Sequence, residues 1–281
     1  MKTIKYTDLL PGDVLLHASK GEVSKLIQWA SNSDYSHIAL VFKPGELAEA
    51  ISSGVHFDDN LVDRLKGIPE KFHRIDAWRS IGAGDPISDA ALAALRTSAQ
   101  QMAGRPFALS QWFELGLICA VRNKAPQNPF CKWLIAKAIN ELVKVDPSRL
   151  LCSEFVYLSF FNAVTQPADV LKPKLTRPPR KNRPFPKDLD VWELIREYLD
   201  AKQKGSGSAA VIAILSDFAS VSSQDIDAEW MTGQAAVLQL ARAQWSTLFV
   251  SSGVSPHPDL IEPQDFAECP ASFRELGSVT L

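Results

Sequence analysis

Residues 150–157 read Leu-Leu-Cys-Ser-Glu-Phe-Val-Tyr, and they place a thiol where an apolar, strand-like run turns into a helix. The N-terminus of a helix carries a partial positive charge, which favours an anionic thiolate over the neutral thiol. A cysteine in apolar surroundings can equally be an ordinary core residue, because free cysteines are usually buried. The choice between nucleophile and core residue therefore depends on which other groups the fold brings to Cys152.

A histidine in the first half of the chain supplies such a group. His37 opens the apolar run of residues 38–42, which is typical of a strand buried on both faces. An imidazole at the end of such a strand can be held rigidly against a helix N-terminus, as a thiol–histidine pair requires. The Lys-Pro-Gly-Glu turn at residues 43–46 predicts a hairpin, whose second strand brings Glu49 beside His37 to orient the imidazole.

Taken together, these segments resemble the permuted papain-like amidases of the YaeF/YiiX type. The resemblance rests on residues 10–16, 26–30, 35–41, 49–50 with 54–55, and 152–156, and it covers about residues 5–195. That group belongs to the NlpC-type cysteine peptidase superfamily, whose ordinary order is cysteine before histidine. His37 precedes Cys152 here, as in the permuted branch. The implied fold is α+β, circularly permuted papain-like, with an antiparallel sheet packed against helices and a C-terminal helical extension.

The resemblance also implies roles for individual residues. Cys152 would be the nucleophile, His37 the general base and then the general acid, and Glu49 the group that orients His37. Tyr35 is a candidate to donate its hydroxyl to a developing oxyanion beside the backbone N–H of Cys152. The alternative for Tyr35 is that its ring packs under the strand. Ser153 and Tyr157 are further candidates for oxyanion or substrate contacts.

The implied chemistry is nucleophilic acyl transfer. The Cys152 thiolate would attack a carbonyl, and the acyl-enzyme would be released by water or another acceptor. We expect a cysteine hydrolase, an amidase or thiol protease, that acts on an amide bond in a peptide or peptidoglycan fragment. One alternative is a lipid deacylase, thioesterase or acyltransferase of the lecithin retinol acyltransferase-like kind, which shares the histidine-first order. Another is a binding protein that kept the fold without turnover.

Composition excludes several other classes. The 281 residues carry 30 basic and 32 acidic side chains, a formal charge of −2, so no general affinity for nucleic acid is expected. We expect cytoplasmic synthesis, because residues 1–7 lack the apolar core of a signal peptide and no apolar stretch is long enough to span a membrane. Delivery of the protein to another compartment by a dedicated secretion system is an alternative that the sequence leaves open. The four cysteines show no CxxC spacing, so we expect no metal and no other cofactor.

The chain is expected to contain a catalytic domain and an extension. The catalytic domain is predicted at residues 1–203, with a helical insertion at about 88–145. A flexible Gly/Ser linker follows, and residues 204–281 are predicted to form a helical extension with an irregular tail. Helices at 209–250 either pack on the catalytic domain, bind a protein partner or regulate access to the cleft.

Local patterns give further expectations. Strands are predicted near residues 13–17, 37–43, 46–51 and 73–77, and helices near 22–31, 88–104, 109–121, 130–144, from 152, 190–202, 209–221 and 227–249. In the insertion, Trp112, Phe113 and Trp133 either contact an acyl group or pack the helices. The basic, proline-rich loop at 172–187 is either solvated or binds an anion. His17, after the first strand, is a candidate to line the cleft.

Overall fold

The computed structural model describes residues 2–82, 84–107, 150–175, 186, 188–190, 193, 196–197 and 261–281. In chain order its elements are β1 (Thr3–Lys5), the 3-10 helix η1 (Tyr6–Asp8), β2 (Asp13–Ser19), α1 (Glu22–Ala30), β3 (His37–Lys43), β4 (Glu46–Ile51), β5 (Gly54–Asn60), α2 (Leu61–Lys66), β6 (Phe72–Ser80), α3 (Asp89–Gln100), α6 (Cys152–Phe161), α10 (Pro263–Ala267) and β7 (Phe273–Thr280). The fold class is therefore α+β, as the sequence predicts.

One seven-stranded sheet organises these elements. Its strand order is β1-β7-β6-β2-β3-β4-β5, and all neighbouring strands are antiparallel except the parallel pair β1 and β7. The predicted hairpin joins β3 to β4, with Lys43 opposite Glu46. The sequence did not predict β1, β5 or α2. The five expected helices at 109–121, 130–144, 190–202, 209–221 and 227–249 lie wholly or largely outside the described residues.

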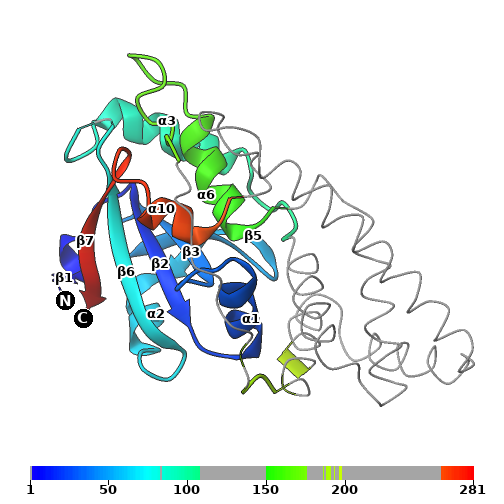
Figure 1. The fold of residues 1–281 in the computed structure, drawn as a ribbon. Helices are drawn as coiled ribbons and strands as arrows, with labels where there is room; N and C mark the ends of the chain where they lie inside the picture. The colour runs from blue at the N-terminus through cyan, green and yellow to red at the C-terminus, as the bar shows by residue number, and fades with distance from the viewer. Residues whose placement is uncertain are drawn as a thin grey trace, which may run out of the picture.

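The central strands are buried on both faces, because helices cover the sheet from two sides (Figure 1). Alternate residues of β2 enter different core clusters. Val14 and Leu16 pack with the apolar side chains of α3 and α6, whereas Leu15 packs with Leu61 and Leu65 of α2. This arrangement explains why the sequences of β2 and β3 are almost continuously apolar.

Helix α6 begins at Cys152 because the chain is extended at Leu151 and becomes helical directly after it. The Glu154 carboxylate accepts a hydrogen bond from the Leu151 N–H at 3.3 Å, which favours a helix start here. The helix packs against β3, β4 and α3. Since its side chains are apolar on nearly every side, α6 is a core helix, and its N-terminus points Cys152 toward the ends of β3 and β4.

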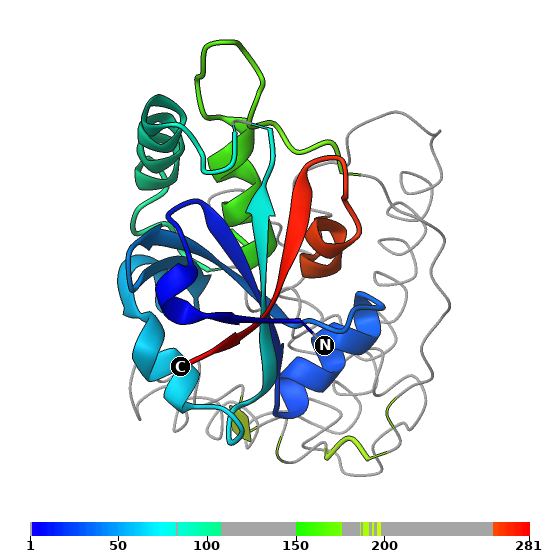
Figure 2. The ribbon, with the colours of Figure 1, turned by 90° about the vertical axis from the view of Figure 1, so that its left-hand side faces the viewer.

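The C-terminal residues depart from the prediction of a helical extension with an irregular tail. Strand β7 lies between β1 and β6, so residues 273–280 are an integral part of the sheet (Figure 2). A bulge interrupts the period-two alternation of this strand, so the sequence pattern does not reveal it. The register shifts where Ala77 faces Gly277 and Trp78 faces Glu275, which leaves Leu276 as the extra residue. The expectation for residues 204–260 falls outside the described residues.

In the described part of the chain, no helix has both the length and the apolar character needed to cross a membrane.

Gly277 gives a test of the role of β7. Its φ is +123°, and a Cβ there would lie 2.5 Å from the carbonyl oxygen of Lys2 on the neighbouring strand segment. Gly277→Ala should therefore lower the free energy of unfolding by more than the roughly 1–2 kcal/mol of a left-handed alanine. Gly45→Ala is the matched control, because Gly45 also has a positive φ of +76° but nothing within 4 Å. Urea unfolding that shows equal losses for the two variants would contradict this account of β7.

Candidate active site

His37 and Glu49 meet at the ends of two neighbouring strands. His37 is the first residue of β3, and Glu49 lies on the adjacent strand β4. The His37 Nε2 atom lies 2.5 Å from the Glu49 Oε2 atom, and the Glu49 side chain is fully buried. The hairpin therefore brings the two residues together as the sequence predicts, and the carboxylate fixes the orientation of the imidazole.

Arg64 of α2 completes the surroundings of Glu49 and was not predicted from the sequence. Its guanidinium contacts both carboxylate oxygens, with Nη1 at 3.2 Å from Oε2 and Nη2 against Oε1. Burial alone raises the pKa of Glu49, but hydrogen bonding to His37 and the charges of His37 and Arg64 outweigh it, so the pKa falls well below its usual range. Burial and the neighbouring Glu49 raise the pKa of Asp59. The ionised form of Glu49 is thus favoured between the His37 imidazole and the Arg64 guanidinium.

Cys152 approaches His37 from the other side. Burial lowers the pKa of His37, but the charge of the Cys152 thiolate, a hydrogen bond to Cys152 and the carboxylate of Glu49 raise it to about 9. Because Nε2 is engaged by Glu49, Nδ1 is the nitrogen left for the thiol. Cys152 is the first residue of α6, so its backbone N–H belongs to the unpaired first turn of the helix. The arrangement places the imidazole of His37 between a carboxylate and a thiol at a helix N-terminus.

His17 is a second buried histidine beside this pair. It lies opposite His37 in the β2–β3 ladder, with the ring centroids 5.2 Å apart, and Phe72 covers it at 5.5 Å. Neither ring nitrogen makes a hydrogen bond with a described residue. Burial, together with the charges of His37 and Arg64, lowers the pKa of His17 well below its usual value, whereas Glu49 and the His37 backbone act in the opposite direction. His17 is therefore a neutral ring that packs against His37.

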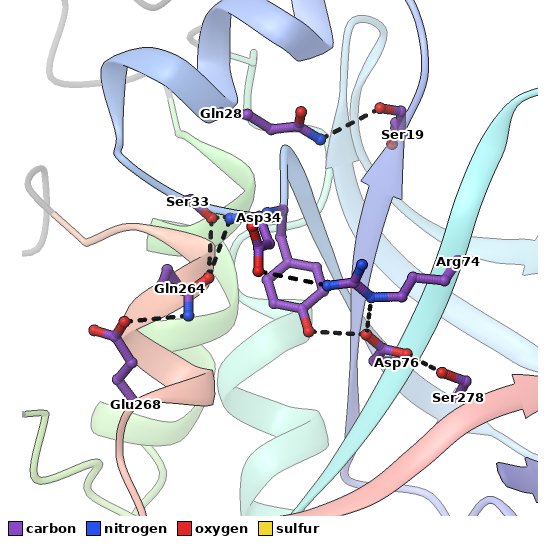
Figure 3. A network of polar contacts seen from close by, with 10 residues as sticks. Ser19, Gln28, Ser33, Asp34, Arg74, Asp76, Gln264, Glu268 and Ser278 are labelled. Carbon is purple, nitrogen blue, oxygen red and sulfur yellow. Dashed lines mark hydrogen bonds and ion pairs between the residues drawn. The ribbon is translucent and has the colours of Figure 1, made fainter. Parts of the chain in front are cut away.

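The structure gives Tyr35 a different contact from the oxyanion role suggested by the resemblance. Its hydroxyl donates to the Asp76 Oδ2 atom at 2.8 Å, and its buried ring meets Trp78 edge-on. Burial and the charge of Asp76 raise the pKa of Tyr35. Arg74 pairs with the same Asp76 oxygen at 2.7 Å (Figure 3). The alternative of ring packing is therefore the one observed, and the hydroxyl points to β6 instead of to Cys152.

Ser153 and Tyr157 are also engaged by the fold. The Ser153 hydroxyl donates to the Ile261 carbonyl at 2.5 Å. Tyr157 is 2 % exposed and stacks on Phe161, with ring centroids 5.3 Å apart. Ser153 lines the pocket described below, but its hydroxyl is directed at the backbone, and Tyr157 belongs to the core. Of the groups expected to contact an oxyanion, the backbone N–H of Cys152 in the first turn of α6 is the one that these contacts leave as a candidate.

The segment around α10 braces both halves of the site. In this segment the Ile261 carbonyl accepts the hydrogen bond of the Ser153 hydroxyl, and the Gln264 side chain contacts the loop that precedes β3. The Gln264 side-chain oxygen accepts from the Asp34 N–H at 3.2 Å and from the Ser33 hydroxyl at 3.4 Å (Figure 3). The C-terminal segment thus links the helix that carries Cys152 to the loop that leads into His37.

A pocket of about 310 Å³ opens beside Cys152 and His37. Its walls come from α1, the end of β4, the start of α6, Phe107 and Pro263. The helical pattern of α1 is predicted from the sequence, but its position as a wall of the pocket is not. The candidates Trp112, Phe113 and Trp133 fall outside the described residues. In the described part of the chain, no group of three or more His, Cys, Asp or Glu side chains is arranged to hold a metal ion.

Comparisons with known proteins identify no family. No family model matches the sequence, and no curated protein matches it. Among solved structures, one that matches is described as the metalloprotein YiiX from Escherichia coli O157:H7, with 22 % sequence identity and a TM-score of 0.36. The match covers 55 % of this chain and 66 % of that protein, slightly less than two thirds of its length. What the present fold and site define by themselves is an α+β protein with a thiol, an imidazole and a carboxylate in contact.

The charge on His37 can be tested by NMR titration of its imidazole. Glu49→Gln should lower the pKa of His37 from about 9, because it removes a negative charge that stabilises the imidazolium. Glu46→Gln is the matched control, since Glu46 lies at the exposed start of the same strand and pairs with Lys43. A His37 pKa that is the same in Glu49→Gln and in the wild type would show that the carboxylate does not set the charge of the imidazole.

Proposed function

We propose that this protein is a cysteine hydrolase that cleaves an amide bond through an acyl-enzyme. Cys152 is the nucleophile, His37 is the general base and then the general acid, and Glu49 orients His37. The observation that supports this proposal is the position of one imidazole, His37, between a buried carboxylate and a thiol at a helix N-terminus. A carboxylate–imidazole–thiol arrangement is the general signature of an activated sulfur nucleophile.

The proposed reaction has two steps. In the first, the Cys152 thiolate attacks the carbonyl carbon of the substrate, and the oxygen that becomes negative accepts a hydrogen bond from the backbone N–H of Cys152. The His37 imidazolium gives its proton to the leaving amine as the carbon–nitrogen bond breaks, which leaves a thioester on Cys152. In the second step, neutral His37 takes a proton from water, the hydroxide attacks the thioester, and the carboxylic acid and the thiolate–imidazolium pair are released.

Arg64 stabilises the ionised carboxylate of Glu49. A buried carboxylate that lost one of its partners would be an uncompensated charge, which is strongly destabilising. With Arg64 on one side, Glu49 can remain ionised through both steps while His37 alternates between imidazolium and imidazole. Arg64 is therefore a positioning residue, since it acts on the reaction through Glu49.

Two substrate classes fit this reaction. A peptide amide, such as that of a cell-wall fragment, is the substrate class that the sequence resemblance implies. A deacylase, thioesterase or acyltransferase that acts on lipid-like substrates is the second candidate, and the apolar character of the pocket favours it. Both candidates form the same acyl-enzyme on Cys152, and they differ in the group that leaves.

Product analysis with the full-length protein tests the proposal. Incubation with peptidoglycan peptides should release a new amine if the protein is a peptide amidase, whereas phospholipid vesicles should release fatty acid or lysolipid if it is a lipid deacylase. Cys152→Ala should reduce the active reaction at least about a thousandfold and leave the fold intact. Cys269→Ala is the control, because Cys269 is the other described free cysteine and is buried away from His37, with its thiol on the Lys174 carbonyl. Full activity in Cys152→Ala would contradict the proposal.

A further inference from the structure

One wall of the pocket is a face of helix α1. Val23, Ile27 and Ser31 lie four residues apart and share this face, and all three line the pocket. The Ser31 hydroxyl donates to the Ile27 carbonyl at 2.6 Å, so it is satisfied within the helix. This wall therefore presents the aliphatic side chains of Val23 and Ile27 together with Ser24, while the Ser31 hydroxyl is engaged within the helix.

The remaining walls combine apolar side chains with serines. Ala50, Ile51, Phe107, Leu151 and Pro263 contribute apolar side chains, and the serines are Ser19, Ser36, Ser52 and Ser153. The Ser153 hydroxyl is bonded to a carbonyl of the protein backbone, and the Ser36 hydroxyl donates to the His17 carbonyl at 3.5 Å. Apart from His37 and Cys152, the surface that the described lining presents to the pocket is predominantly apolar.

Glu197 is the only charged side chain in the described lining apart from His37 and Cys152. Its carboxylate accepts hydrogen bonds from the backbone N–H groups of Glu22 at 3.0 Å and Val23 at 2.9 Å, at the N-terminus of α1. A Cβ on Gly21 would lie 2.8 Å from the Glu197 Oε1 atom, so a glycine at this position lets the carboxylate approach. The charge of Glu197 is therefore offset by the helix and is not presented unpaired to the pocket.

The Glu197 carboxylate also occupies the N-terminus of α1, where the pocket would otherwise bind an anion. Free backbone N–H groups at a helix N-terminus are a natural site for a carboxylate or phosphate. In this protein Glu197 already uses those of Glu22 and Val23. No Lys or Arg side chain is among the described lining residues. An acidic acyl group would thus enter an apolar space in which the one described cationic group, His37, is already engaged by Glu49 and Cys152.

We propose that the pocket selects an uncharged, aliphatic acyl group, so that the acyl-enzyme on Cys152 carries a hydrocarbon chain. The inference rests on the proposed function, because it names the acyl part of the substrate of that same site. Each methylene buried in an apolar pocket favours binding, whereas an unpaired charge loses its hydration without compensation. The inference therefore favours a fatty acyl substrate over the peptidyl group of a cell-wall fragment. The leaving group lies outside this selection, so a fatty N-acyl amide and a fatty ester both fit.

A matched set of acyl groups tests this selection. The 4-nitrophenyl esters of hexanoic, 6-aminohexanoic and adipic acid present a methyl, an ammonium and a carboxylate at similar chain lengths. We expect kcat/KM for the hexanoyl ester to exceed that of each charged ester at least tenfold. From acetyl through butyryl to hexanoyl, kcat/KM should rise about fourfold for each added methylene. Reactions with Cys152→Ala and His37→Ala supply the background.

The outcomes separate the inference from the proposed function. Intact-protein mass spectrometry shows whether Cys152 becomes acylated by each ester. Equal acylation by all three esters, with equal kcat/KM, would overturn the selection of an aliphatic group and leave the cysteine hydrolase intact. A Cys152 that none of the esters acylates would contradict the proposed function and the inference with it.

A variant of the pocket wall gives a second readout. Ile27→Trp should fill part of the pocket and lower kcat/KM for the hexanoyl ester at least tenfold, while the acetyl ester changes less than threefold. Val164→Trp is the matched control, because Val164 is 90 % exposed and is not among the lining residues. Circular dichroism checks that both variants are folded. An equal loss with the acetyl and hexanoyl esters in Ile27→Trp would show that the chain does not occupy this pocket.

Discussion

The buried carboxylate of Glu49 is the interaction on which the site depends. A fully buried anion is tolerated only when it is paired, and here His37 and Arg64 engage its oxygens. The pairing links three elements, because Glu49 lies on β4, His37 on β3 and Arg64 on α2. It also raises the pKa of His37 beside Cys152. The same contact therefore joins two strands and a helix and favours the charged form of the imidazole.

The rest of the fold brings Cys152 to this fixed imidazole. Helix α6 packs on β3 and β4, so its first residue arrives at the ends of those strands. The C-terminal segment then braces the junction, since Ile261 receives the Ser153 hydroxyl and Gln264 holds the loop before β3. Tyr35 anchors the same loop to Asp76 of β6. Residues 261–281 are thus part of the domain that carries the candidate site and not an appendage to it.

The sequence predicted the parts of the site that depend on local pattern. The hairpin turn and the apolar runs were enough to place His37 beside Glu49, and the strand-to-helix transition was enough to locate the start of α6. Arg64 was missed because its partner is 15 residues away on another element, and an arginine on a short surface helix has no distinctive spacing. Strand β7 was missed because a bulge breaks its alternation of buried and exposed residues. The hydrogen bond from the Glu22 N–H of α1 to the Glu197 carboxylate was missed because it joins residues 175 positions apart. Long-range pairing of this kind leaves no local signal.

The most direct test of the central claim is the pH dependence of Cys152 alkylation by a small thiol reagent, measured by peptide mass spectrometry in the wild type and in His37→Ala. The account predicts fast labelling of the wild type at pH 6 and its loss in His37→Ala, because the imidazolium keeps the thiol ionised. Labelling that rises only where free cysteine ionises, near about pH 8.5, and that is unchanged in His37→Ala would contradict it. That result would mean that Cys152 and His37 are neighbours without being a reactive pair.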